Sequence, residues 1–194
     1  KKRSEKPKIG VVGVGHLGQH HVKHLSKMEN ICFSGIYDRD LERGEKIAST
    51  YGVKFFHSLT DLIDICDGLS IVTPTADHAD TALTCIKRGK HVFIEKPIAD
   101  SVVSADILIN EAVAQNVFIQ VGHIERLNPA LLSVKNYELN PKFIEIQRLA
   151  PYTARGTDVP VVLDLMIHDI DILLHFVPSK VQTITATGLS IMTD

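Results

Sequence analysis

The sequence has few features of a secreted, membrane-spanning or nucleic-acid-binding protein. Its three cysteines, Cys32, Cys66 and Cys85, are odd in number and show no CxxC spacing, so we expect them to be reduced and buried. No stretch approaches the roughly 18 consecutive apolar residues of a membrane span, and no apolar segment typical of a signal peptide follows the basic KKRSEKPK. The formal net charge of -2, with a single Lys/Arg cluster, argues against a nucleic-acid surface. We therefore expect a cytoplasmic protein with no nucleic-acid or membrane partner.

The 194 residues, 44% of them hydrophobic and 23% charged, are typical of a globular chain with a sizeable core. Short β-rich runs alternate with amphipathic segments of helix length between residues 8 and 120, the pattern of parallel βαβ units. The pattern predicts an α/β fold with a doubly wound parallel sheet. The strands expected are 9–12, 32–37, 68–72, 91–94 and 117–121, and the main helices are 17–28, 41–51, 76–88 and 102–115.

A different pattern begins after Gly122. There we expect helices at 128–137 and 163–176 and strands at 142–149 and 181–192. The sequence thus predicts two domains, a dinucleotide-binding domain at 1–122 and part of a substrate and oligomerisation domain at 123–194. A sheet that small is marginal on its own. We therefore expect either further residues beyond 194 or a partner chain to cover it.

A GxGxxG motif, Gly13, Gly15 and Gly18, follows the first predicted strand and begins the first predicted helix. In this context Gly13 permits a tight turn, Gly15 lets the backbone approach a pyrophosphate, and Gly18 lets helix and strand pack closely. Asp38 ends the next strand, where a carboxylate accepts hydrogen bonds from ribose hydroxyls and repels a 2′-phosphate. These features favour NAD; the adjacent Arg39 keeps NADP open as an alternative.

Three histidines in the same helix, His16, His20 and His24, recur every four residues and so share one face. A metal stripe and a polar helix flank both fit this spacing. A metal there would compete with the pyrophosphate for the start of the helix. We therefore expect no metal.

Two further groups are suited to proton transfer. Lys96 follows the strand at 91–94, at the sheet edge where open α/β folds bind ligands. Asp164 and His168 stand four residues apart on one predicted helix, so the carboxylate could orient the imidazole. The residues alone leave alternatives open. Lys96 could be an ordinary surface lysine, and Asp164 and His168 could be an ion pair beside the core or part of a metal site.

Several motifs along the whole chain match one known family. They are GVGHLG at 13–18, Thr73-Pro74-Thr75 followed by His78, Glu95-Lys96-Pro97, Gly122 with Arg126 and Pro129, and Asp164 with His168. Through them the sequence resembles the Gfo/Idh/MocA oxidoreductases. The resemblance implies a Rossmann domain that binds NAD(P), followed by a C-terminal α+β domain. The C-terminal domain has a large, open, mostly antiparallel sheet, of which this sequence contains only a part. In the family this domain carries the sugar site and the interface of a homo-oligomer.

The resemblance also implies roles for particular residues: Lys96 next to the reacting hydroxyl, His168 as the acid/base and Asp164 as its orienting partner. The residues that the glycine motif and the resemblance together assign to the cofactor are Gly13, Gly15, His16, Leu17, Gly18, Asp38, Arg39, Thr73, Pro74, Thr75, His78, Glu95 and Lys96. Those assigned to the substrate are Lys96, Asp164 and His168. Arg126, Tyr152 and Arg155 are polar candidates for binding the diphosphate or the sugar, and an ordinary surface position is the alternative for each.

Two segments, 123–129 and 163–171, look like those of bacterial nucleotide-sugar 3-dehydrogenases acting on substrates of the UDP-N-acetylhexosamine type. We therefore expect an NAD-dependent dehydrogenase that oxidises a secondary sugar hydroxyl, C3 of such a nucleotide sugar, to a keto sugar. Other sugar, inositol or dihydrodiol dehydrogenases of the family are the near alternatives. An NAD(P)-sensing regulator is an alternative of another class, although a sensor needs no proton-transfer groups.

Overall fold

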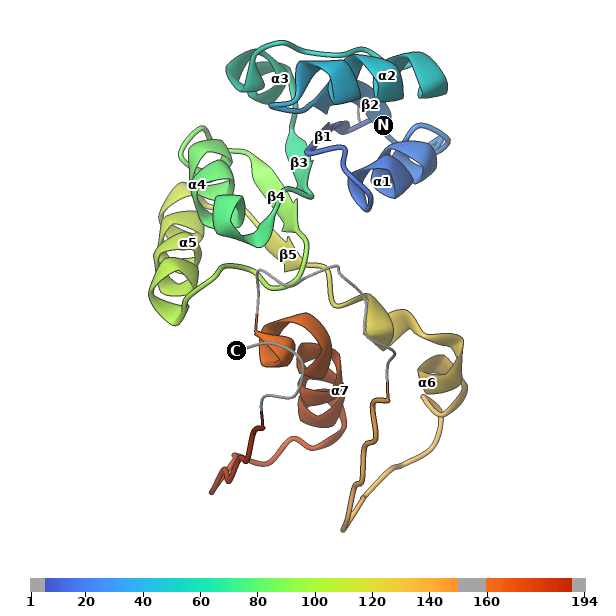
Figure 1. Ribbon diagram of the computed structural model, residues 1–194, viewed down its shortest axis with the longest axis vertical. Coiled ribbons are helices and arrows are strands. Elements are labelled where there is room, and N and C mark those ends of the chain that lie inside the picture. Colours follow the sequence, from blue (N-terminus) through green and yellow to red (C-terminus); the bar gives the residue numbers. More distant parts are fainter. Residues whose placement is uncertain (1–5, 150–159, 190–194) are drawn as a thin grey trace, which may run out of the picture.

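A five-stranded parallel sheet forms the centre of the first half of the chain (Figure 1). The computed structural model describes residues 6–149 and 160–189. The strand order is β2-β1-β3-β4-β5, so the chain passes outwards from β1 on both sides, as in a doubly wound sheet. The Rossmann-like α/β prediction is therefore confirmed. The strands are β1 (Lys8–Val12), β2 (Cys32–Tyr37), β3 (Gly68–Ile71), β4 (His91–Ile94) and β5 (Ile119–Val121).

Helices cover both faces of this sheet and bury two separate apolar clusters. On one face α1 (Gly18–Leu25) and α2 (Leu41–Tyr51) pack over a cluster that contains Val11 and Ile36. On the other face α3 (Leu59–Ile65), α4 (Thr75–Ile86) and α5 (Val102–Gln115) enclose a cluster that contains Val12 and Ile71. Successive side chains of a strand point to opposite faces, so Val11 and Val12 belong to different clusters. With both faces covered, the strands are almost continuously apolar.

The helix ends follow local sequence signals. The side chains of Asp40, Ser58 and Ser101 cap α2, α3 and α5, because each accepts a hydrogen bond from a backbone N–H three residues on. Gly52 ends α2 in the left-handed conformation, with φ of 64°. These caps fix where each helix begins or ends, and hence where the loops at the edge of the sheet start.

The cysteines are all free, but only two are buried as expected. Burial raises the pKa of Cys66 to about 11 and that of Cys85 to about 12. Both thiols therefore stay protonated and pack as small apolar groups. Cys32 is exposed, which corrects the expectation for that residue, because its side chain lies at the start of the edge strand β2.

The helix expected at 163–176 is present, and the one expected at 128–137 is shorter. All the regular elements in the described part of the second half are helices. They are η1 (Ile124–Leu127), α6 (Pro129–Ser133), the π-helical turn η2 (Val162–Met166) and α7 (Ile167–Phe176). The strands expected at 142–149 and 181–192 are not formed in the residues described, because a strand needs a hydrogen-bonded neighbour and neither described segment has one. Residues 190–192 of the second lie outside the described part. The antiparallel sheet is therefore not formed in the part of the chain described.

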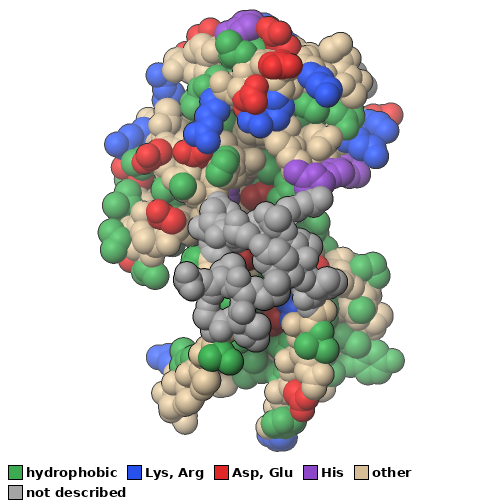
Figure 2. Space-filling view, viewed as in Figure 1, with side chains coloured by type: hydrophobic (Ala, Val, Ile, Leu, Met, Phe, Trp, Pro, Cys, Tyr) green, Lys and Arg blue, Asp and Glu red, His purple; other side chains and the backbone are tan. Residues whose placement is uncertain are grey.

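Many apolar side chains of this second half are exposed (Figure 2). Ile124, Leu127 and Phe143 are among those with a large exposed fraction. Within the described ranges, no helix combines the length and apolar character needed to cross a membrane.

Candidate cofactor site and catalytic cluster

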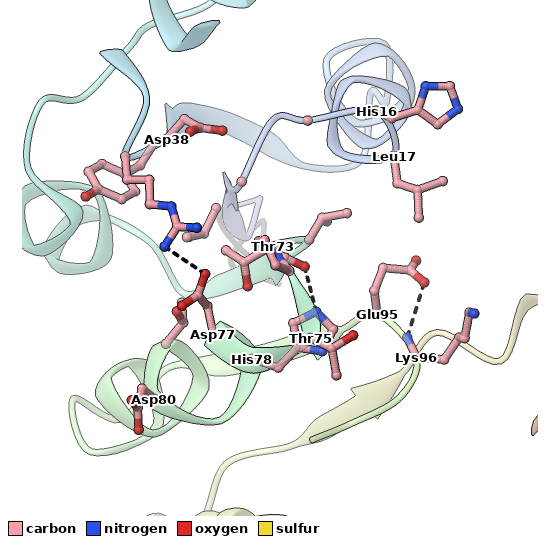
Figure 3. A pocket seen from close by; sticks show the side chains of 18 of the residues that line it. His16, Leu17, Asp38, Thr73, Thr75, Asp77, His78, Asp80, Glu95 and Lys96 are labelled. Atoms are coloured by element: carbon pink, nitrogen blue, oxygen red, sulfur yellow. Dashed lines mark hydrogen bonds and ion pairs between the residues drawn. The ribbon is translucent and has the colours of Figure 1, made fainter. Parts of the chain in front are cut away.

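A cavity of about 820 Å³ opens at the carboxyl ends of the strands (Figure 3). Its walls come from the glycine loop after β1, the ends of β2, β3 and β4, the start of α4, and Asp164 from the second half of the chain. Ligands of open α/β sheets bind at this edge, where the strand order reverses. Asp38 and Lys96 line well-separated parts of the cavity (Figure 3), so it suits an extended ligand.

The three glycines of the loop have different surroundings. Gly13 has φ of +85°, and a Cβ there would lie 2.7 Å from the carbonyl oxygen of Val72. A Cβ on Gly18 would overlap the carbonyl oxygen of Gly13, so this position brings helix α1 against the loop. A Cβ on Gly15 would meet no protein atom within 4 Å, yet Gly15 lines the cavity. The loop thus leaves open space above Gly15 at the start of α1, where backbone N–H groups attract anions.

Asp38 is 3% exposed and both of its oxygens are engaged. They accept hydrogen bonds from the backbone N–H groups of Val14 and Asp40, both at 2.8 Å, and from Nε and Nη2 of Arg43 at 3.2 and 2.8 Å. Burial alone would raise the pKa of Asp38, but these hydrogen bonds and the charge of Arg43 hold it below its ordinary value. Asp38 is therefore an ionised carboxylate at the cavity wall.

Arg43 also lines the cavity, and sequence reasoning missed it. Arg43 follows Asp38 by five residues and lies in the first turn of α2, and this spacing matches no known motif. Arg39, which kept NADP open, forms an ion pair with Asp77 of α4, with Nη1 and Oδ2 3.0 Å apart. Each arginine at this end of the cavity is therefore paired with a carboxylate, which leaves neither cation unpaired for a 2′-phosphate.

The change Asp38→Asn is expected to improve binding of NADP relative to NAD by about tenfold. The substitution removes the charge that repels a 2′-phosphate and frees the Arg43 guanidinium to pair with it. Calorimetric dissociation constants for both dinucleotides measure the ratio. Arg88→Met, which breaks an exposed ion pair with Asp64 outside the cavity, is the control. An unchanged ratio in Asp38→Asn would show that Asp38 does not discriminate between the two cofactors.

The loop after β3 provides Thr73, Pro74 and Thr75 to the cavity wall. Oγ1 of Thr73 is buried and has no hydrogen-bond partner within the described chain, so it is available to a ligand. His78 is 1% exposed, and its ring nitrogens lie 2.8 and 2.9 Å from the carbonyl oxygens of Pro97 and Thr73. His78 thus joins two loops of the cavity wall.

Lys96 lies at the far end of the cavity from Asp38, and its peptide bond to Pro97 is cis. Its Nζ donates to the backbone oxygen of Asp164 at 2.6 Å and to Oδ1 of the same residue at 3.0 Å. An ammonium group has three N–H donors, so one remains for a ligand. The tertiary structure thus brings together two residues that are 68 positions apart.

His168 follows on the first turn of α7. Burial, together with the positive charge of Lys96, lowers the pKa of His168 below its ordinary value, so its imidazole is neutral at neutral pH. Its Nδ1 is buried and has no hydrogen-bond partner among the residues described. We expected Asp164 to orient His168, but the carboxylate of Asp164 points to Lys96 instead, because Asp164 lies in the π-helical turn that faces the cavity.

The remaining predicted substrate residues lie elsewhere. Arg126 forms a two-pronged ion pair with Asp171 of α7, with Nε 2.7 Å from Oδ2, which joins η1 to α7. It lines a second, smaller cavity rather than the main one. Tyr152 and Arg155 lie outside the described residues.

The histidines of α1 and of the loop before it do not form a metal site in the described structure. His16 and His20 make an edge-to-face ring contact with centroids 5.8 Å apart. No group of three or more His, Cys, Asp or Glu side chains is placed to hold a metal ion anywhere in residues 6–149 and 160–189. His16 and Leu17 line the cavity beside the glycine loop, where the sequence placed them.

The cavity as a whole fits a dinucleotide. The open space above Gly15 suits a pyrophosphate, and the unpartnered Oγ1 of Thr73 offers a further polar contact. The ionised Asp38 lies at the cavity wall directly after β2, where Rossmann folds bind the ribose of the cofactor. A family model described as "Oxidoreductase family, NAD-binding Rossmann fold" matches residues 7–123. The chain belongs to the Gfo/Idh/MocA oxidoreductase family. NAD is accordingly the cofactor of its Rossmann domain.

Several proteins of known name are similar to this member of the family. A UDP-N-acetylglucosamine 3-dehydrogenase from Acidithiobacillus ferrooxidans is 34% identical over 188 residues, 96% of this chain and 59% of that protein. A solved structure of that enzyme superposes with a TM-score of 0.90 over 96% of this chain and 61% of that one. An inositol 2-dehydrogenase from Rubrobacter xylanophilus is 29% identical over 197 residues, 96% of this chain and 57% of that protein.

A structure of GenD2 from gentamicin A biosynthesis in complex with NAD is 25% identical, with a TM-score of 0.64 over 69% of this chain and 39% of that one. This chain thus spans about three fifths, or less, of the length of these relatives.

Proposed function

We propose that this chain is the NAD-binding part, with the start of the substrate domain, of a dehydrogenase that oxidises a secondary hydroxyl of a sugar. The observation that carries the proposal is the pair of Lys96 and Asp164 at the end of the cavity away from Asp38. His168 lies outside the cavity lining but close enough for the charge of Lys96 to lower its pKa. A protein that only senses NAD needs no such group. Oxidation of a carbinol needs a donor to its oxygen and an acceptor for its proton.

These residues can divide the work as follows. NAD, when bound, supplies the hydride acceptor. The free N–H of the Lys96 ammonium donates to the substrate oxygen and stabilises the negative charge that develops there. Asp164 holds that ammonium in place through two hydrogen bonds. The neutral imidazole of His168 accepts the hydroxyl proton.

We propose that the substrate is a UDP-N-acetylhexosamine and that the hydroxyl at its C3 is oxidised. The support is the similarity to the Acidithiobacillus ferrooxidans enzyme, which extends over nearly the whole chain in sequence and structure. The similarity to an inositol 2-dehydrogenase keeps a polyol as the second candidate. Assembly into a homo-oligomer through the second domain stays a prediction.

The test is reduction of NAD by the full-length protein, followed by the absorbance of the reduced nicotinamide. UDP-N-acetylglucosamine, UDP-N-acetylgalactosamine, UDP-glucose, free N-acetylglucosamine and myo-inositol form the panel, with a scavenger for the keto product. We expect turnover with the UDP-N-acetyl sugars and little with the free sugar. Turnover with inositol alone would favour the second candidate, and NAD binding without any turnover would favour the sensor.

The pH dependence tests the role of His168. A base must be neutral to accept a proton, and the pKa of His168 is lowered by burial and by Lys96. The acid limb of kcat/KM should therefore lie below the ordinary range of a histidine, and the rate should no longer depend on this group at neutral pH. His168→Asn is expected to lower kcat/KM by about 100-fold and to remove that limb. The exposed His24→Asn is the control. An acid limb that persists unchanged in His168→Asn would contradict the assignment.

A further inference from the structure

A second polar group lies beside Lys96 and is not used by the chemistry proposed above. It is a hydrogen-bonded chain of Ser70 on β3, His21 on α1 and Glu95 at the end of β4. Nδ1 of His21 lies 2.9 Å from Oγ of Ser70, and Nε2 lies 3.2 Å from Oε1 of Glu95. Oε2 of Glu95 accepts from the backbone N–H of Lys96 at 3.3 Å. The chain connects the middle of the sheet with the cavity wall, because Glu95 lines the cavity and Ser70 is buried.

The carboxylate of Glu95 is closely confined. The side chains of His21 and Glu95 are only 23% and 17% exposed, and the His21 ring also packs against Phe93, with centroids 5.6 Å apart. A Cβ on Gly122 would lie 2.9 to 3.0 Å from the Glu95 carboxyl group. The group is therefore held between α1 and the segment after β5, and a side chain at position 122 would displace it.

The charges around Glu95 explain its ionisation. A carboxylate only accepts hydrogen bonds, so Nε2 of His21 carries the proton of their contact. Burial alone would raise the pKa of Glu95, but the hydrogen bond and charge of His21, with a smaller contribution from Lys96, hold it below its ordinary value. The other charged group nearby, Asp164, is hydrogen-bonded to Nζ of Lys96. His21 is thus the main partner that offsets the burial of Glu95.

We propose that His21 is a positioning residue that keeps Glu95 as a fixed carboxylate at the nicotinamide end of the NAD site. If the ribose binds at Asp38 and the pyrophosphate at Gly15, the nicotinamide extends towards Glu95 and Lys96 (Figure 3). The oxidised nicotinamide ring carries a positive charge, and the reduced ring is neutral. A carboxylate at this end of the cavity therefore stabilises bound NAD more than bound NADH.

The experiment measures dissociation constants of NAD and NADH by titration calorimetry at a mildly acidic and at a neutral pH. Without His21, burial raises the pKa of Glu95, so its charge is lost first at the lower pH. His21→Leu removes the hydrogen bond to Glu95, so we expect NAD to bind about fivefold more weakly at the lower pH while NADH changes less than about twofold. His21→Gln retains an N–H donor and should restore most of the NAD affinity. Glu95→Gln, which removes the charge without changing the shape, should weaken NAD at both pH values. The exposed His24→Leu on the same helix is the matched control.

Two outcomes would overturn the proposal: NAD binding by His21→Leu and Glu95→Gln that equals that of the wild type at both pH values, or an equal loss of NAD and NADH in both variants. The second outcome is what a purely structural role predicts. Thermal unfolding of each variant identifies any that fail to fold, and Glu95→Gln still tests the charge if His21→Leu is one of them. No sugar is present in these titrations, so the result is independent of the substrate proposed above.

Discussion

Replacing Lys96 by alanine is expected to lower kcat/KM for the sugar by about 1,000-fold, with less than about a threefold change in the dissociation constant of NAD. The Lys96 ammonium is the cation that lies at the end of the cavity and retains a free N–H for the substrate oxygen. Its removal leaves the developing negative charge without a donor. We expect other residues to contact the pyrophosphate and the ribose, so these contacts should persist.

The measurement is steady-state NAD reduction, together with calorimetric binding of NAD. Lys87→Ala is the matched control, because Lys87 is exposed at the end of α4 and lies outside the cavity. Lys96→Arg keeps the charge but not the compact ammonium, and we expect it to recover only a small part of the rate. Full activity of Lys96→Ala would exclude Lys96 from the chemistry and with it the proposed mechanism.

Replacing Gly15 by valine is expected to weaken NAD binding by at least about 30-fold without a loss of fold stability. A Cβ at this position meets no protein atom within 4 Å, so the folded chain accommodates it. The same open space, at the start of α1, is where we expect the pyrophosphate to approach the backbone. The side chain would therefore exclude the cofactor rather than disturb the protein.

Gly18→Ala provides the contrast. Its Cβ would overlap the Gly13 carbonyl, so we expect it to lower the free energy of unfolding by about 2 kcal/mol or more. Urea unfolding monitored by circular dichroism measures stability, and titration calorimetry measures binding of NAD. The two substitutions should thus have different effects: Gly15→Val weakens binding of NAD, and Gly18→Ala lowers the stability of the fold. Tight NAD binding by Gly15→Val would show that the cofactor does not pass over this loop.

Much of the Rossmann domain could be predicted because its signals are local. Apolar runs such as 68–71 produce strands covered on both faces, and residues such as Asp40 and Gly52 begin and end helices by hydrogen bonds within a few positions. The glycine loop was also predictable, because its spacing reflects the turn itself. The NAD-binding family follows from the same local motifs.

The second half was predicted less well because its structure depends on distant neighbours. Alternating apolar residues at 142–149 and 181–189 have strand character, yet no strand forms there among the described residues. The spacing of Asp164 and His168 fits a regular helix, but the π-helical turn directs Asp164 to Lys96. Arg43 and His21 were missed because their partners, Asp38 and Glu95, are recognised only by contact.

The sequence by itself determined the order of strands and helices, the glycine loop with Asp38 after the next strand, and the residue types suited to moving a proton. These depend on side-chain periodicity and on backbone conformations that a few neighbouring residues control. Only the tertiary structure decided which charges meet: Arg43 on Asp38, His21 on Glu95, and Lys96 on Asp164. The ends of parallel strands bring residues from separate βα units to one edge of the sheet. The positions of two residues in the sequence give neither the distance between their charges nor the burial of each.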